Sequence, residues 1–170
     1  MTSDSLDDMQ TKQLLALGSV ITASGALEDL LRDAFCALVG SKFAAVVAGG
    51  QGADWLIGYC KALVEAHFEL PEASRESVKV ALQLCRSAND LRNQLVHGVQ
   101  TVSTGPDGAF DVYRSRRHQY RPQVRQWTPS RIDDVADALV HAYEELFNAM
   151  FVEVGPDIAV LSDQLEWEEP

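Results

Sequence analysis

Apolar residues recur every three or four positions through most of the chain, which is the spacing of one helical face. The pattern predicts a first helix over residues 8–39, a second over 53–68 and a third over 74–97. A fourth helix is expected to begin at Thr128-Pro129, because threonine is a good N-cap and proline fits the first helical position. Four amphipathic helices with mostly short links predict an all-α fold, an antiparallel four-helix bundle.

The apolar positions of the first predicted helix are Leu14, Leu17, Ile21, Leu27, Leu31, Ala34, Phe35 and Leu38. Gly40 is the expected end of this helix, since glycine readily adopts the left-handed conformation found there. Gly18 and Gly25 weaken its middle by about 1 kcal/mol each. They are compatible either with the close approach of another helix or with a kink.

A β-hairpin is expected between the third and fourth helices. Gly98 breaks the third helix, and the stretches 99–103 and 109–114 flank the turn-forming Gly105-Pro106-Asp107-Gly108. The following stretch, 114–127, either extends the hairpin as an edge strand or forms a mobile loop. Pro122 makes a central strand there improbable, because proline cannot donate a ladder hydrogen bond.

Length and composition indicate one globular domain. Of the 170 residues 46% are hydrophobic and 23% are charged, which is ordinary for a soluble protein. We expect a disordered acidic N-terminus over 1–9, a helical domain over 10–155 and an acidic tail over 156–170. No uninterrupted apolar run approaches the roughly 18 residues of a membrane span, and the polar N-terminus is unlike a signal peptide. A cytoplasmic protein without a membrane partner is therefore predicted.

The charge is distributed unevenly. The net charge of −11 makes the surface as a whole repel nucleic acid, yet six of the 14 basic residues lie between Arg114 and Arg131 with no acidic residue among them. Cations with interleaved aromatic rings can bind an RNA backbone and stack its bases. A solvated edge, or a surface for an acidic partner or the acidic tail, is the alternative. The candidate RNA-binding residues are Arg114, Arg116, Arg117, Tyr120, Arg121 and Arg125.

No metal or cofactor is expected. Cys36, Cys60 and Cys85 are widely separated without a Cys-x-x-Cys pair, so buried apolar roles are favoured over a disulfide framework or a zinc site. His67, His118 and His141 show no ligand spacing.

The chemically richest segment is the end of the third helix, residues 89–98. Arg92 offers a planar cation suited to phosphate oxygens, and His97 can exchange a proton near neutral pH. At about 100° per residue, Asn93 and His97 share one face, whereas Arg92 lies roughly 140° away from His97. The three groups can therefore meet at one phosphate only if the arginine side chain curls around the helix, or if a second copy completes the site.

The motif Arg92-Asn93-x-x-x-His97, at the end of an amphipathic helix in a small helical protein, resembles the Arg-polar-x-x-x-His motif of the HEPN superfamily. The resemblance implies a homodimeric bundle that acts as a metal-independent endoribonuclease, with Arg92 and His97 as the catalytic pair and Asn93 supporting them. Cleavage of RNA to a 2′,3′-cyclic phosphate and a 5′-hydroxyl, in a toxin-antitoxin or phage-defence module, is the expected activity.

Two other interpretations remain open. Some members of the superfamily are non-catalytic, so the chain could instead be a dimeric bundle that binds an antitoxin or a nucleotidyltransferase. Arg92 could also serve only an internal ion pair, with His97 as a helix cap.

Overall fold

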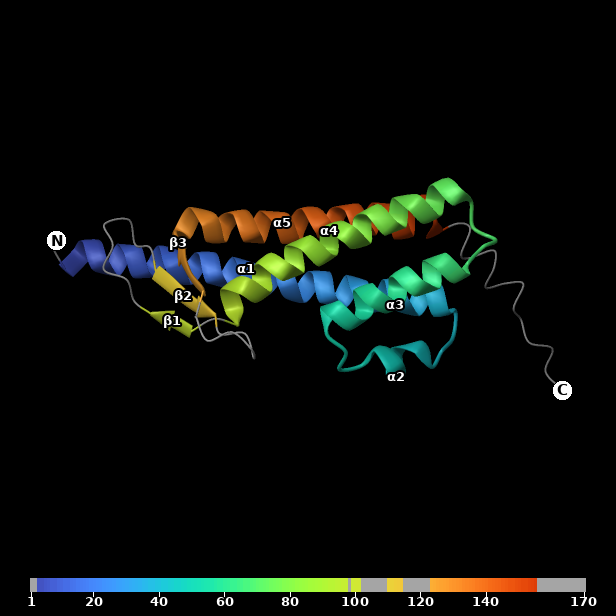
Figure 1. The fold of residues 1–170 in the computed structure, drawn as a ribbon, viewed down its shortest axis with the longest axis horizontal. Helices are drawn as coiled ribbons and strands as arrows, with labels where there is room; N and C mark the ends of the chain where they lie inside the picture. The colour runs from blue at the N-terminus through green and yellow to red at the C-terminus, as the bar shows by residue number, and fades with distance from the viewer. Residues whose placement is uncertain (1–2, 98, 102–109, 115–122, 156–170) are drawn as a thin grey trace. The chain divides into compact units, whose positions relative to one another are not determined.

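The structure is a computed structural model, and it describes residues 3–97, 99–101, 110–114 and 123–155. It is mostly helical, so the all-α class holds at that level (Figure 1). Six helical segments and three short strands follow one another in these residues: α1 (Ser3–Val39), α2 (Ala44–Ala48), α3 (Ala53–Ala66), α4 (Glu72–Val96), β1 (Val99–Thr101), β2 (Phe110–Arg114), β3 (Gln123–Trp127), α5 (Pro129–Phe147) and η1 (Asn148–Glu153).

The chain divides into two compact units. Residues 1–25 and 88–139 form the first, called here the sheet unit because it holds all three strands. Residues 26–87 and 140–170 form the second, called here the helix unit. α1, α4 and α5 each contribute residues to both units.

Two expected helix boundaries are confirmed by local geometry. The backbone N–H of Arg131 donates to Oγ1 of Thr128 at 3.2 Å, so threonine is the N-cap of α5 and Pro129 is its first residue. Gly40 has a φ of 63°, the left-handed conformation in which glycine ends a helix. By contrast, α1 begins at Ser3, so residues 3–9 are helical where a disordered segment was expected.

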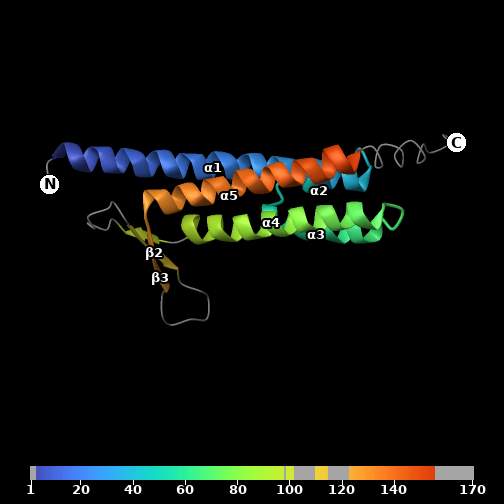
Figure 2. The same cartoon turned by 90° about the horizontal axis from the view of Figure 1, so that it is seen from above.

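The three strands form one antiparallel sheet in the order β1-β2-β3. β2 and β3, which are labelled in Figure 2, pair with each other. Val99 pairs with Tyr113, and Phe110 pairs with Trp127. β3 is an edge strand, so the stretch before α5 extends the sheet, as one of the two sequence-based alternatives proposed. The turn over 105–108 and the stretch 115–122 lie outside the described residues.

The core of the sheet unit combines one face of α1 with the start of α5 and the sheet. Its buried apolar residues are Ala16, Val20, Ala88, Leu95, Trp127, Ile132, Val135, Ala136 and Leu139. The sequence pattern selected the wrong face of α1 here: Leu14 and Ile21 are 70% and 66% exposed, whereas the smaller Ala16 and Val20 are buried. This part of α1 is apolar on more than one side, so periodicity alone could not select the face that packs.

Gly18 and Gly25 have open space where a Cβ would lie, with no heavy atom within 4 Å. The close approach of another helix is therefore not the reason for these glycines within the described part of the chain. α1 also runs without interruption through both positions, from Ser3 to Val39.

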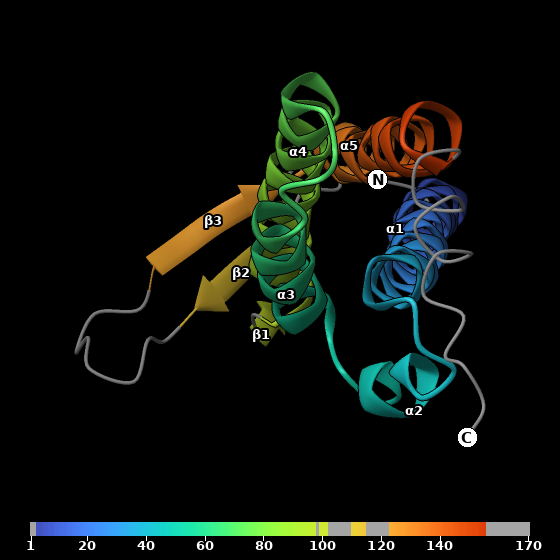
Figure 3. The same ribbon diagram turned by 90° about the vertical axis from the view of Figure 1, so that its right-hand side faces the viewer.

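The helix unit is built by pairwise packing of helices. On α3, the Trp55 ring lies 5.4 Å from the Phe35 ring of α1, and the Cys60 thiol lies 3.8 Å from the Leu31 carbonyl. The short helix α2 forms part of the connection between α1 and α3 (Figure 3). The π-helical segment η1, which continues α5, had no counterpart in the sequence-based prediction.

α4 packs on α5 in the same unit. The Cys85 thiol of α4 lies 3.7 Å from the Ala142 carbonyl of α5, and the Ser77 hydroxyl donates to Glu153 of η1 at 2.7 Å. These contacts link the first half of α4 to the last part of the helical run 129–153.

One helix in the described residues is long and apolar enough to cross a membrane by length and composition. The segment Thr11–Val39 of α1 has a window of mean hydropathy 1.5, of which 28% is buried inside the protein. Core helices of globular proteins and signal sequences pass the same test. The cytoplasmic location predicted from the sequence therefore stays a prediction.

Candidate functional site

The last turns of α4 carry the candidate site, in the sheet unit. Ala88 and Leu95 are buried and fix one side of the helix against the core. Arg92 and Asn93 are half-buried, and His97 is exposed immediately after the last helical residue. The His97 N–H still donates to the Asn93 carbonyl at 3.2 Å, so the backbone turn that separates the two side chains retains helical geometry.

Arg92 joins the other two side chains. Its Nη1 donates to Oδ1 of Asn93 at 3.0 Å and lies 3.4 Å from Nε2 of His97. The arginine side chain therefore curls around the helix, which is the intramolecular route to convergence that the sequence left open. One guanidinium, one amide and one imidazole meet on a partly solvent-exposed surface.

The direction of the contact between Arg92 and His97 depends on the imidazole tautomer. A guanidinium has only donor N–H groups, so a hydrogen bond between the two groups requires Nε2 as the acceptor. In that tautomer, an acceptor nitrogen of His97 lies beside the Arg92 guanidinium.

The Arg92 guanidinium retains unused hydrogen-bonding capacity. Its Nε is buried and has no hydrogen-bond partner in the structure. Leaving a buried donor unsatisfied costs roughly 1–3 kcal/mol. The folded chain therefore holds Arg92 in place but leaves its buried Nε–H donor without an acceptor.

Asn89 lies one turn before Asn93 on α4 and is not among the site residues expected from the sequence. Among the described residues it is the one buried polar side chain, with 6% of its surface exposed. Its position four residues before Asn93, which itself lies four residues before His97, places all three on one stripe of α4. That repeated spacing of four was the available signal.

The candidate RNA-binding segment is described only in part. Arg114 is the last residue of β2 and pairs with Gln123, and Arg125 of β3 pairs with Val112. Both arginines thus belong to the sheet unit, which also carries Arg92 and His97. Arg116, Arg117, Tyr120 and Arg121 lie outside the described residues.

All three cysteines are free thiols. Burial raises the pKa of Cys60 to about 12, nearby thiols contributing further, and burial likewise raises the pKa of Cys85 to about 12. Cys36 is half-buried, so the expectation of three buried thiols is correct for two of them. No group of three or more His, Cys, Asp or Glu residues gathers as metal ligands within the described part of the chain.

Both ring nitrogens of His67 have hydrogen-bond partners within the protein. Nδ1 of His67 lies 2.5 Å from a Glu69 carboxylate oxygen, and Nε2 lies 2.7 Å from the Leu38 carbonyl. Partial burial lowers its pKa, but the hydrogen bonds to Glu69 and Leu38 outweigh this, and the net pKa is raised. This histidine connects the end of α3 to the end of α1.

Comparisons with known proteins give no significant match. No protein-family model matches the chain. No curated protein and no solved structure matches it significantly either. The function must therefore be argued from the arrangement of the residues themselves.

Proposed function

We propose that the protein is a metal-independent endoribonuclease of the HEPN type, which cuts RNA to a 2′,3′-cyclic phosphate and a 5′-hydroxyl in a toxin-antitoxin or phage-defence module. The observation that supports this most directly is the bridge from Arg92 to both Asn93 and His97. It brings a proton-accepting imidazole and a phosphate-binding cation together where a substrate can reach them.

The chemistry follows from the two groups. Unprotonated Nε2 of His97 takes the proton of the ribose 2′-OH, and the resulting alkoxide attacks the adjacent phosphorus. Arg92 holds the non-bridging phosphate oxygens as negative charge develops on them. The protonated imidazole then returns a proton to the departing 5′ oxygen, which balances the step. General acid–base catalysis of this kind contributes about 10²- to 10⁴-fold.

Binding of the substrate would change the hydrogen-bond partners of Arg92. A phosphate oxygen that accepts from Nη1 replaces Nε2 as the partner of Arg92, and the histidine nitrogen is released for the 2′-OH. Asn93 then keeps the guanidinium in position through its Oδ1. The role assigned to Asn93 is therefore to position Arg92.

Arg114, Arg116, Arg117, Tyr120, Arg121 and Arg125 are proposed to hold the RNA strand beside the site. The presence of Arg114 and Arg125 in the sheet unit supports this assignment. The protein's net charge of −11 requires such a local concentration of cations, because the remaining surface repels a polyanion.

We also propose how the helices are arranged and how two copies of the chain pair. We assign α1, α3, α4 and α5 to an antiparallel four-helix bundle, with the sheet inserted between its third and fourth helices. Two copies would pair as a homodimer, so that two Arg92-Asn93-His97 sets share one cleft. The exposed apolar side chains of α1 in the sheet unit, Leu14, Leu15 and Ile21, support a contact with a second chain.

The test is RNA cleavage in EDTA by the wild type, His97→Ala and His141→Ala. His141 is the matched control, because it is an exposed histidine on α5 in the other unit. We expect the His97 variant to lose cleavage by about 10²-fold or more while His141→Ala retains it. The product should carry a 2′,3′-cyclic phosphate, detected by mass spectrometry. Equal cleavage by all three proteins would remove His97 from the mechanism.

A non-catalytic dimeric bundle that binds an antitoxin or a nucleotidyltransferase is the second candidate. The exposed apolar residues Leu14, Leu15 and Ile21 favour it as well, because they suit a protein partner. It becomes the better account if the wild type cuts no RNA and its overexpression does not slow growth. Slowed growth that depends on His97 would instead support the nuclease.

A further inference from the structure

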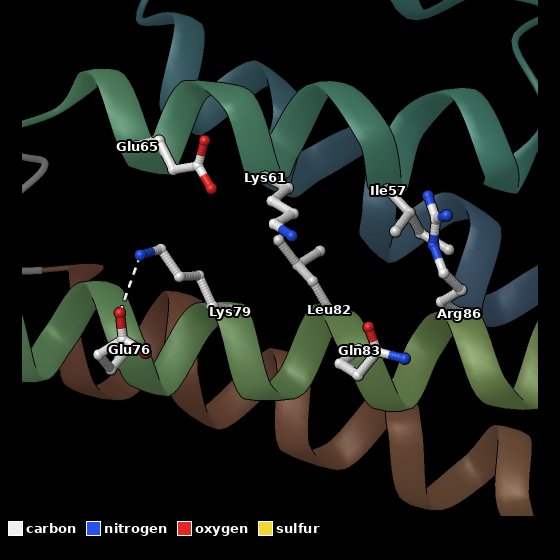
Figure 4. Close-up of a pocket in the computed structure, with 8 residues that line it drawn as sticks. All are labelled: Ile57, Lys61, Glu65, Glu76, Lys79, Leu82, Gln83 and Arg86. Atoms are coloured by element: carbon white, nitrogen blue, oxygen red, sulfur yellow. Dashed lines mark hydrogen bonds and ion pairs between the residues drawn. The ribbon is translucent and has the colours of Figure 1, made fainter.

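A groove lies between α3 and α4 in the helix unit (Figure 4). Its volume is about 340 Å³, which is within the range of small-molecule sites. The floor is apolar, because Ile57 of α3 and Leu82 of α4 line it and are both 2% exposed. The remaining lining residues are polar or charged.

Helix geometry explains this lining. Residues 57, 61 and 65 follow one another at four-residue steps on α3, and residues 76, 79, 83 and 86 follow at three- or four-residue steps on α4. The facing helices place Arg86 across from Ile57, and Lys79 across from Glu65 (Figure 4). Glu65, Glu76 and Lys79 lie at one end of the groove, Lys61 lies in the middle opposite Leu82, and Arg86 lies at the other end (Figure 4).

The three cations that line the groove differ in whether they form an ion pair. Nζ of Lys79 pairs with Glu76 at 2.8 Å. Lys61 and Arg86 form no hydrogen bond or ion pair with the described residues, although both project into the groove. Three cations against two carboxylates leave the lining with a net charge of +1, in a protein of net charge −11.

We propose that this groove binds a small organic anion with an apolar body. Its phosphate or carboxylate oxygens accept hydrogen bonds from Lys61 and Arg86, and its apolar part lies against the aliphatic stems of the lining side chains, above the buried Ile57 and Leu82. Arginine and lysine donors with an anion form charge-assisted hydrogen bonds, which are stronger than neutral ones. Glu65 and Glu76 disfavour an anion at their end of the groove, so the anionic group is directed toward Lys61 and Arg86.

The experiment is calorimetric titration of the full chain with phenyl phosphate, benzoate, inorganic phosphate and phenol. We expect phenyl phosphate or benzoate to bind, and the stronger of the two identifies the anionic group. Inorganic phosphate lacks the apolar body and phenol lacks the anion, so both should bind more weakly. Equal affinity for inorganic phosphate and phenyl phosphate, or no binding of either aromatic anion at millimolar concentrations, would overturn the proposal.

Variants locate the binding in the groove. Lys61→Gln and Arg86→Gln should each weaken binding by about tenfold, the loss of one charge-assisted hydrogen bond. Glu65→Gln should leave it unchanged or tighten it. Lys42→Gln, an exposed lysine of the same unit outside the groove, is the control. Wild-type affinity in both Lys61→Gln and Arg86→Gln, or an equal loss in Lys42→Gln, would contradict the assignment.

This site is independent of the proposed nuclease. Binding of phenyl phosphate should be unchanged in His97→Ala, because His97 belongs to the sheet unit. If RNA cleavage fails and the anion still binds, only the nuclease proposal falls. If His97→Ala abolishes anion binding, the ligand occupies the Arg92–His97 site and the proposal for the groove is wrong.

Discussion

Nη1 of Arg92 lies 3.4 Å from Nε2 of His97, although the two residues point roughly 140° apart around α4. The length of the arginine side chain overcomes this difference, and Asn93 accepts the same Nη1 at 3.0 Å. A shorter side chain, or a cation without the planar guanidinium, could not contact both Asn93 and His97 in the same geometry.

Replacement of Arg92 by lysine should therefore impair cleavage even though the charge is kept. An ammonium is a point charge without the planar fork of a guanidinium. We expect a loss of about 10²-fold in the rate of RNA cleavage, as for removal of one transition-state donor. Single-turnover kinetics in EDTA measure it. Arg32→Lys is the matched control, because Arg32 pairs with Glu28 and Asp29 on α1 and has no role in the site.

Replacement of Gly18 or Gly25 by alanine should stabilise the folded chain. Each has open space where the new Cβ would lie, and alanine is favoured over glycine inside a helix by about 1 kcal/mol. Urea denaturation followed by circular dichroism measures the free energy of unfolding. Gly40→Ala is the contrasting variant: its φ of 63° makes alanine costly by about 1–2 kcal/mol. A destabilised Gly18→Ala would mean that something contacts this part of α1.

The three thiols should differ in reactivity. The pKa of Cys60 and of Cys85 is raised to about 12, so almost no thiolate is present at pH 8, and both side chains are buried. Partial burial and the nearby Asp33 also raise the pKa of Cys36, but its side chain is only half-buried. A thiol-specific chromogenic reagent should therefore label Cys36 before the other two cysteines in the native protein, and all three in denaturant. Cys36→Ala should abolish the rapid phase. Rapid labelling of two or three thiols in the native state would show that the helix unit opens readily.

Stability should depend on pH through His67. Its pKa in the folded protein is raised above the usual value by the hydrogen bonds to Glu69 and Leu38, which outweigh partial desolvation. The stabilisation is complete below the unfolded-state pKa of about 6.5 and is lost as the pH rises through the folded-state pKa. The lowered pKa of Glu69 keeps its carboxylate charged in this range.

Urea denaturation of the wild type and His67→Gln at several pH values tests this. The difference in the free energy of unfolding should be largest near about pH 5.5 and smaller near about pH 8.5. His141→Gln is the control variant, because His141 is an exposed histidine of the same unit. A difference that grows with pH would contradict the assigned direction of the pKa shift.

Most helix positions could be predicted from the sequence because they depend on local chemistry. The Thr128-Pro129 start of α5 and the Gly40 end of α1 require only capping and backbone preferences, and both are confirmed. α1 begins at Ser3 rather than at residue 8, because the apolar periodicity that predicts the helix does not extend into its polar first turns. The π-helical segment η1 has no such local signal.

The spacing of Arg92, Asn93 and His97 and the helical repeat around them are local properties, so they follow from the sequence alone. The tertiary structure decided which face of α1 is buried, since Leu14 and Val20 are both apolar and only packing distinguishes them. It also decided that the Arg92 side chain curls toward His97, and that Lys61 and Arg86 face one groove. Such contacts join separate turns or separate helices, and their free energy depends on the packing of the folded chain rather than on local periodicity.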